Sequence, residues 1–169
     1  MLHIITSPLV YRRLQAEIDH AISTGKVSSP VSDAEARQLP YLQACIKEGL
    51  RIWPPITGVQ PRVSATDALI CGLHIPKGTN VGWSAKTVMR DREVFGEDAE
   101  LYSPERWLID AGRKGEEERL QRMEKTVDLV FGSARWGCLG RGISLLELNK
   151  IFVEVSFLAM SSVYMYCTE

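Results

Sequence analysis

The stretch FGSARWGCLGRG, residues 131–142, holds a single cysteine among glycines, aromatic residues and two arginines, just before the helix-like run ISLLELNKIFVEV. Cys138 therefore precedes a helix N-terminus, where unpaired backbone N–H groups and the helix dipole favour an anion such as a thiolate. Gly132, Gly137 and Gly140 allow the backbone to turn tightly or to approach a flat partner closely. The residues alone leave three interpretations open: a reactive thiol, a single thiolate ligand for a metal, and a buried structural cysteine.

The composition is that of an ordinary globular chain of 169 residues, 45% hydrophobic and 24% charged. Twenty lysines and arginines stand against 21 acidic residues, so no basic surplus indicates a nucleic-acid or anionic-membrane binder. The four cysteines are widely spaced and form no CxxC pair, which argues against a zinc site and against a disulfide framework. A reducing, intracellular setting is favoured.

No membrane-spanning helix is expected from the sequence. The most apolar run, IFVEVSFLAMSSVYMY, contains Glu154 and is shorter than the roughly 20 residues that a bilayer requires.

Helical periodicity appears in three places. Ser7-Pro8 is a typical helix start, and apolar residues every fourth position predict a helix over 8–24. A second helix is expected from Pro40 to the residue before Trp53, and a third from about Gly140. The third carries an apolar stripe of Leu145, Leu148, Phe152 and Val155.

The regions between these helices have weaker signals. Residues 57–83 read as short strands broken by turns at Cys71-Gly72 and Lys77-Gly78, and 84–95 as one more short helix. From there through GRKGEEERLQR the chain is expected to be irregular and exposed.

Two charged residues on the second helix have an ambiguous role. Glu48 and Arg51, at positions i and i+3, share one helix face, and by themselves they read most simply as a solvated ion pair.

The cysteine loop resembles the haem-binding signature of the cytochrome P450 haem-thiolate monooxygenases. Phe131, Gly132, Cys138 and Gly140 stand at the family spacing. Trp136 occupies the position where many members carry an arginine that binds a haem propionate.

Other segments resemble the family in the same order along the chain. KEGLR, with Glu48 and Arg51, is similar to the Glu-x-x-Arg motif, and PERW, with Arg106, to the motif that completes a buried Glu-Arg-Arg triad. QPRVS, with Arg62, resembles the strand whose arginine meets a propionate. HIPKGTNVGW and VFGEDAELYSPERW are most similar to fungal members.

The resemblance implies a mainly α fold with a small β portion. It corresponds to the carboxy-terminal part of the family domain: the end of helix I, helices J and K, the small sheet, the meander, the cysteine loop and helix L. Residues 1–154 would be a partial cytochrome P450 domain and 155–169 a divergent tail.

It also implies a site that holds haem b. Cys138 would be the proximal iron ligand, and Phe131, Gly132 and Gly140 would shape the loop around it. Arg62 would bind a propionate and Arg135 would stand in for the arginine missing at Trp136. Glu48, Arg51 and Arg106 would form a structural triad that locks the cysteine loop against the helix.

The implied activity is the NADPH-dependent, dioxygen-using oxidation of a small lipophilic organic substrate, with electrons supplied by a cytochrome P450 reductase. The family setting is the cytosolic face of the endoplasmic reticulum, held by an anchor that this chain lacks. No residue of this sequence matches the acid and alcohol side chains that deliver protons in the family. No catalytic residue is therefore expected within the chain, and little turnover is expected from the chain alone. The alternatives are a truncated, non-catalytic remnant with weak or no haem binding, and a haem protein without oxygen activation.

Overall fold

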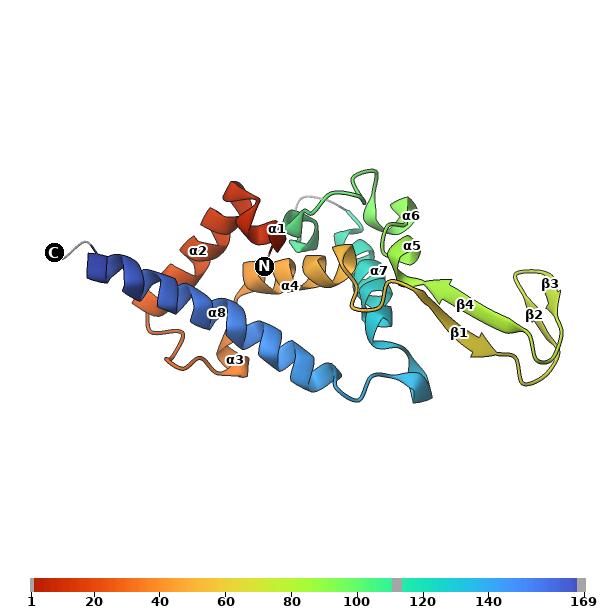
Figure 1. The fold of residues 1–169 in the computed structure, drawn as a ribbon. Helices are drawn as coiled ribbons and strands as arrows, with labels where there is room; N and C mark the ends of the chain where they lie inside the picture. Colours follow the sequence, from red (N-terminus) through yellow and green to blue (C-terminus); the bar gives the residue numbers. More distant parts are fainter. Residues whose placement is uncertain (1, 111–113, 167–169) are drawn as a thin grey trace.

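The computed structural model of the chain describes residues 2–110 and 114–166, with side chains described up to Val155 except that of Ala134. Helices dominate and short strands form a projecting arm (Figure 1), so the predicted mainly α fold with a small β portion is confirmed. In chain order the α-helices are α1 (Leu2–Ile5), α2 (Pro8–Ser23), α3 (Asp33–Ala36), α4 (Pro40–Ile52), α5 (Ala85–Val88), α6 (Arg92–Phe95), α7 (Glu116–Asp128) and α8 (Arg141–Tyr166). The strands are β1 (Val59–Val63), β2 (Ala68–Ile70), β3 (Leu73–Ile75) and β4 (Asn80–Ser84), and the 3-10 helices are η1 (Pro104–Trp107), η2 (Leu129–Phe131) and η3 (Ala134–Trp136).

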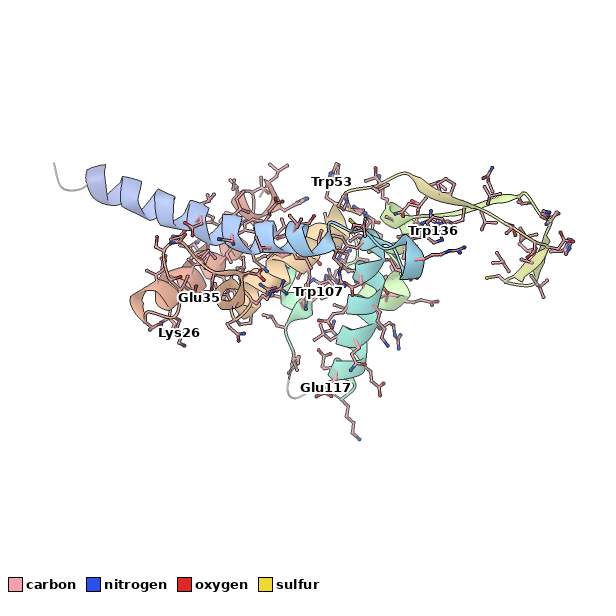
Figure 2. All side chains as sticks on the ribbon, turned by 90° about the horizontal axis from the view of Figure 1, so that it is seen from below. Lys26, Glu35, Trp53, Trp107, Glu117 and Trp136 are labelled. Atoms are coloured by element: carbon pink, nitrogen blue, oxygen red, sulfur yellow. The ribbon has the colours of Figure 1, made fainter. Side chains whose placement is uncertain are left out.

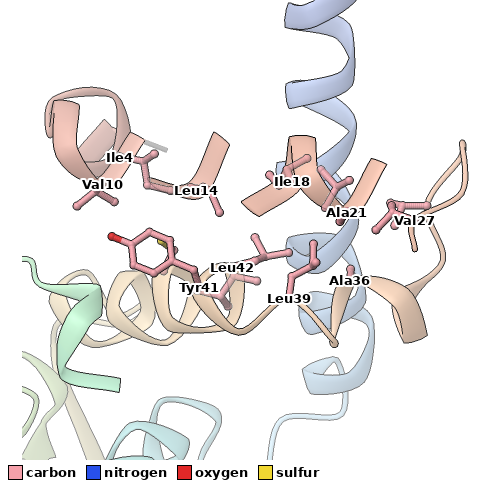
Figure 3. Close-up of a cluster of buried hydrophobic side chains, with 14 residues drawn as sticks. Ile4, Val10, Leu14, Ile18, Ala21, Val27, Ala36, Leu39, Tyr41 and Leu42 are labelled. Carbon is pink, nitrogen blue, oxygen red and sulfur yellow. The ribbon is translucent and has the colours of Figure 1, made fainter. Parts of the chain in front are cut away.

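A first hydrophobic cluster joins α2, α4 and α8. Val10, Leu14 and Ile18 of α2 are buried, and Figure 3 shows them along the face of α2 that is turned toward Tyr41 and Leu42 of α4. Burying an aliphatic side chain of this size stabilises the fold by about 1.5–3 kcal/mol. The apolar residues whose four-residue spacing predicted this helix therefore form the face that packs against α4.

Helix α4 is the central element. It packs against α2, α7, α8 and η1, and it contributes side chains to two separate hydrophobic clusters. Leu42 and Ile46 belong to the first cluster, while Ala44 belongs to a second cluster that includes Met89 and Trp107. The predicted bounds are confirmed, since the helix ends at Ile52 and Trp53 follows it, 72% exposed.

The β arm consists of two antiparallel pairs. β1 pairs with β4, with Arg62 opposite Val81, and β2 pairs with β3 across the predicted turn at Cys71-Gly72. Both turn residues have positive φ, as a tight hairpin turn requires. Gly78 also turns the chain, but it leads from β3 to the return strand β4, so the second predicted break is not a hairpin turn.

The region after the arm differs from the prediction. Residues 84–95 form two short helices, α5 and α6, because Asp91 begins a new helix by accepting a hydrogen bond from the Glu93 N–H. The expected irregular stretch contains η1 and the first part of the 13-residue helix α7, which continues beyond it to Asp128. Helix α7 was missed because its apolar stripe is narrow: Met123 and Val127 are buried on an otherwise charged helix.

Helix α8 starts at Arg141, one residue after the predicted start. Leu145, Leu148 and Phe152 of the predicted stripe are partly buried, and the last two pack against the first cluster. The most buried residues are Asn149 and Val153, beside the stripe, whereas Val155 is 41% exposed. The backbone of the tail 155–169 is helical to Tyr166, and its last three residues lie outside the described part. Across the described residues, no helix combines the length and the apolar character that crossing a bilayer would require.

A carboxylate of α2 holds the start of α4. Glu17 accepts hydrogen bonds from the backbone N–H groups of Tyr41 and Leu42, both at 2.8 Å. These two donors belong to the first turn of α4, where no intrahelical acceptor exists. A negative charge there is also favoured by the helix dipole.

Glu17→Ala is therefore expected to lower the free energy of unfolding by about 1–2 kcal/mol, measured by urea denaturation. The matched control on the same helix is Asp19→Ala. Within the described part of the chain its one hydrogen bond is from the Gln15 amide one turn away, so its loss should cost no more than about 0.5 kcal/mol. Equal losses for both variants would contradict the capping role.

Candidate functional site

The cysteine loop is a compact turn that joins η2 to α8. The Cys138 N–H donates to the carbonyl of Phe131 at 2.6 Å, and the Trp136 N–H donates to the carbonyl of Ser133 at 3.1 Å. Cys138 is exposed three residues before the first residue of α8. The interpretation as a buried structural cysteine is therefore wrong.

Gly132 is the position where this turn requires glycine. Its φ is +75°, and a Cβ built on it would lie 2.5 Å from the carbonyl oxygen of Trp136. A side chain would thus be strained at this φ, and the Trp136 backbone would have to shift to admit its Cβ. At Gly140, by contrast, a Cβ would lie 3.7 Å from the Cys138 sulfur, an ordinary contact distance.

A cavity of about 780 Å³ lies between the loop and the root of the β arm. The guanidinium groups of Arg62 on β1 and Arg135 on η3 both lie over the indole of Trp136, at 5.3 and 5.1 Å from the ring centroid. Figure 2 shows Trp136 at this junction of loop and arm. The lining residues are Gln60, Pro61, Arg62, Val63, Ala65, Trp83, Leu129, Gly132, Ser133, Arg135 and Trp136, so Cys138 is on the same loop but not in this wall.

A fully buried ion pair lies behind the site. Glu48 and Arg51, one turn apart on α4, have no solvent exposure and are joined by two hydrogen bonds, of 2.8 and 2.7 Å. Arg106 of η1 adds a third bond, from its Nε to Glu48 Oε1 at 3.1 Å. The interpretation of Glu48 and Arg51 as a solvated pair is therefore wrong.

Sequence reasoning missed further partners of this carboxylate. The Trp107 indole N–H donates to Glu48 Oε2 at 2.9 Å, and the Ser103 backbone N–H donates to Oε1 at 2.8 Å. Asp98, in turn, accepts from Arg106 through both carboxylate oxygens. Trp107 directly follows Arg106 in PERW, which is the one signal that could have identified it.

The buried guanidinium groups organise the chain between α5 and η1. Arg51 donates to the carbonyls of Met89, Ala99 and Leu101, and Arg106 donates to that of Phe95. Among the described residues, none of the triad's hydrogen bonds ends on the cysteine loop.

The connection of the triad to the loop is instead made by packing. Trp107 is buried in the second hydrophobic cluster, and Phe131 at the start of the loop packs against that cluster. Arg141, just after the loop, lies over the Phe131 ring at 5.7 Å and pairs with Asp128 of α7 at 2.8 Å. The start of the loop is therefore packed against the core, and its far end is linked to α7 by a solvent-exposed pair.

The cysteines differ in their surroundings. Cys45 on α4 is buried, and this desolvation raises the pKa of its thiol to about 12, so it stays neutral at physiological pH. Cys71 is exposed at the tip of the β arm. Cys138 alone of the described cysteines combines exposure with a place before a long helix.

The comparisons with known proteins agree with one another. A family model described as Cytochrome P450 matches residues 1–155. Cytochrome P450 monooxygenase ABA1 of Pyricularia oryzae is 41% identical over 157 residues, which are 92% of this chain and 30% of that protein. The corresponding aba1 protein of Botryotinia fuckeliana is 38% identical over the same coverage, and cytochrome P450 monooxygenase cicH of Emericella nidulans is 41% identical over 154 residues. The chain spans about 30% of the length of these curated relatives.

Glu48→Gln is expected to lower the free energy of unfolding by about 3–5 kcal/mol, because it leaves two buried guanidinium groups without their shared counter-charge. Urea denaturation followed by far-UV circular dichroism measures this. The control is Glu97→Gln, since Glu97 pairs with Arg92 at 3.3 Å where both side chains are well exposed, and less than about 1 kcal/mol should be lost. A similar cost at both positions would contradict the structural role of Glu48.

Gly132→Ala is expected to lower the free energy of unfolding by about 1–3 kcal/mol, because alanine is strained at this φ and its Cβ meets the Trp136 carbonyl. In Gly142→Ala the new methyl group has open space around it on helix α8, and a gain of a few tenths to about 1 kcal/mol is expected. Thermal unfolding of the two variants should shift in opposite directions, and a shift of both in one direction would refute this account of the loop.

Proposed function

The chain belongs to the cytochrome P450 family, and from this premise we propose that it supplies the haem-binding part of a monooxygenase. The thiolate of Cys138 would hold the iron of haem b. The observation that carries this proposal is an exposed cysteine on a tight loop beside an arginine-rimmed cavity. In this reading residues 1–154 are the partial family domain and 155–169 a divergent tail.

The residues around the cavity fit a flat, apolar group that carries carboxylates. Trp83, Leu129 and Trp136 supply apolar surface, while Arg62 and Arg135 supply positive charge. Gln60 lines the same cavity, and its buried Nε2 has no hydrogen-bond acceptor among the described residues. A haem propionate would satisfy such donors, because buried polar groups need a partner.

The chain's own residues would bind, orient and shield the cofactor. When bound, a haem with a thiolate ligand supplies oxidising chemistry, since the thiolate's electron density favours O–O cleavage. Cys138 would hold the iron, Arg62 and Arg135 would orient the macrocycle through its carboxylates, and Phe131 and Trp136 would limit access of water. Gly132 would keep the loop backbone close to the macrocycle, and Gly140 would lie beside the thiolate.

The activity and the partners of the whole protein are proposed from those of the family. The whole protein would oxidise a small lipophilic organic substrate with dioxygen. Electrons would come from NADPH through a cytochrome P450 reductase, at the cytosolic face of the endoplasmic reticulum. The proton-delivering acid and alcohol have no counterpart among the residues of this chain, so turnover by the chain alone is expected to be slight.

The ligand assignment is tested by the absorption spectrum of the haem-loaded, reduced, carbon monoxide-bound chain. A thiolate opposite carbon monoxide should place the main band far to the red of an imidazole-ligated haem. Cys138→Ala should abolish this band because the ligand is removed.

The matched control is Cys45→Ala, which should leave the band in place because Cys45 is buried on α4, away from the loop. If the Cys138→Ala chain kept the red-shifted band, the ligand assignment would be wrong. If the unmodified chain took up no haem, the alternative of a non-catalytic remnant would hold.

A further inference from the structure

Trp136 is an exposed aromatic side chain in contact with two cations. It is 59% exposed, yet the guanidinium carbons of Arg62 and Arg135 lie 5.3 and 5.1 Å from its ring centroid. Tryptophan offers the most favourable ring face for such cation–π contacts, and arginine is the usual cation. One side chain therefore contacts an arginine of the β arm and an arginine of its own loop.

Within the described ranges, these two arginines have no anionic partner. Among the described residues no carboxylate lies within ion-pair distance of either guanidinium, and the cavity that they line contains no acidic side chain. The Nη1 of Arg62 donates to the neighbouring Pro61 carbonyl, at 2.8 Å. By contrast, Arg141 at the end of the loop is paired with Asp128.

The two guanidinium groups are near enough to each other to bind one ligand. Since their carbons lie 5.3 and 5.1 Å from one centroid, the two are no more than about 10 Å apart. A ligand with two adjacent carboxylates would gain charge-assisted hydrogen bonds from both. The two propionates of haem b leave the same edge of the macrocycle and have this character.

We propose that Trp136 is a positioning residue: its indole holds the guanidinium groups of Arg62 and Arg135 at the cavity rim as a two-cation clamp for the porphyrin carboxylates. This inference rests on the proposed haem function and deepens it. The tryptophan would thus replace one arginine of the loop by organising two others.

The backbone of the loop fixes the tryptophan itself. Its N–H is bonded to the Ser133 carbonyl at 3.1 Å, and its carbonyl faces Gly132, where there is no room for a Cβ. The ring is therefore carried by a hydrogen-bonded turn, while the arginine side chains are long and flexible. Contact with the ring reduces the conformational entropy that each arginine would otherwise lose on binding a carboxylate.

The test uses metal-free protoporphyrin IX and its dimethyl ester as probes, because neither contains iron and the two differ only in their carboxylates. Fluorescence titrations of the 169-residue chain should show the free acid binding about tenfold more tightly than the ester. In Trp136→Ala this preference should fall to less than about twofold, and Trp136→Phe, which keeps a weaker ring, should lie between.

Arg62→Ala and Arg135→Ala should each reduce the preference for the free acid over the ester. Adding Trp136→Ala to either variant should then reduce that preference by a smaller factor than Trp136→Ala does in the unmodified chain, because the three side chains act as a unit. The control Trp53→Ala removes another exposed tryptophan, at the end of α4, and should retain the full preference.

The clamp is overturned if Trp136→Ala keeps the preference of the unmodified chain, or if that chain binds acid and ester equally or binds neither. Failure of the proposed function looks different: the porphyrin preference would be present while the iron-loaded chain shows no thiolate-type carbon monoxide band.

Discussion

The carboxylate of Glu48 is the constraint on which the rest of the structure depends. It has no solvent exposure and accepts hydrogen bonds from Arg51, Arg106, Trp107 and the Ser103 backbone. Such a charge is tolerated inside a protein only when each of its partners is in place. Four groups, from one turn of α4, from η1 and from the residue before η1, must therefore meet at a single point, which fixes how the segment between α4 and η1 runs.

The hydrogen bonds of Glu48 also position the candidate site, through side-chain packing. Trp107 belongs to the cluster on which Phe131 rests, and Phe131 begins the loop that carries Cys138. The far end of the loop is linked to α7 by the solvent-exposed Arg141–Asp128 pair. A ligand group needs a fixed position more than it needs many contacts, and packing at the start of a short loop contributes to one.

The sequence predicted those parts of the molecule in which local pattern and tertiary packing agree. The helix from Pro8 shows its buried face as a four-residue repeat, whereas α7 shows only a narrow stripe within a charged run and was missed. The buried face of α8 depends on the elements that pack against it. Asn149 is buried and bonded to Asp33 of α3, whereas the more apolar Val155 stays exposed. Resemblance identified the triad residues, but the path of their hydrogen bonds could be known only from the fold.

The central claim, that Cys138 is the residue that ligates iron, is tested most directly by iron K-edge X-ray absorption of the haem-loaded chain. The measurement is best made with Cys71→Ala and Cys167→Ala, so that neither of these thiols can bind the metal, while burial excludes Cys45. The account predicts one sulfur scatterer in the first coordination shell of the iron. A first shell of nitrogen and oxygen alone, in a chain that has taken up haem, would contradict it.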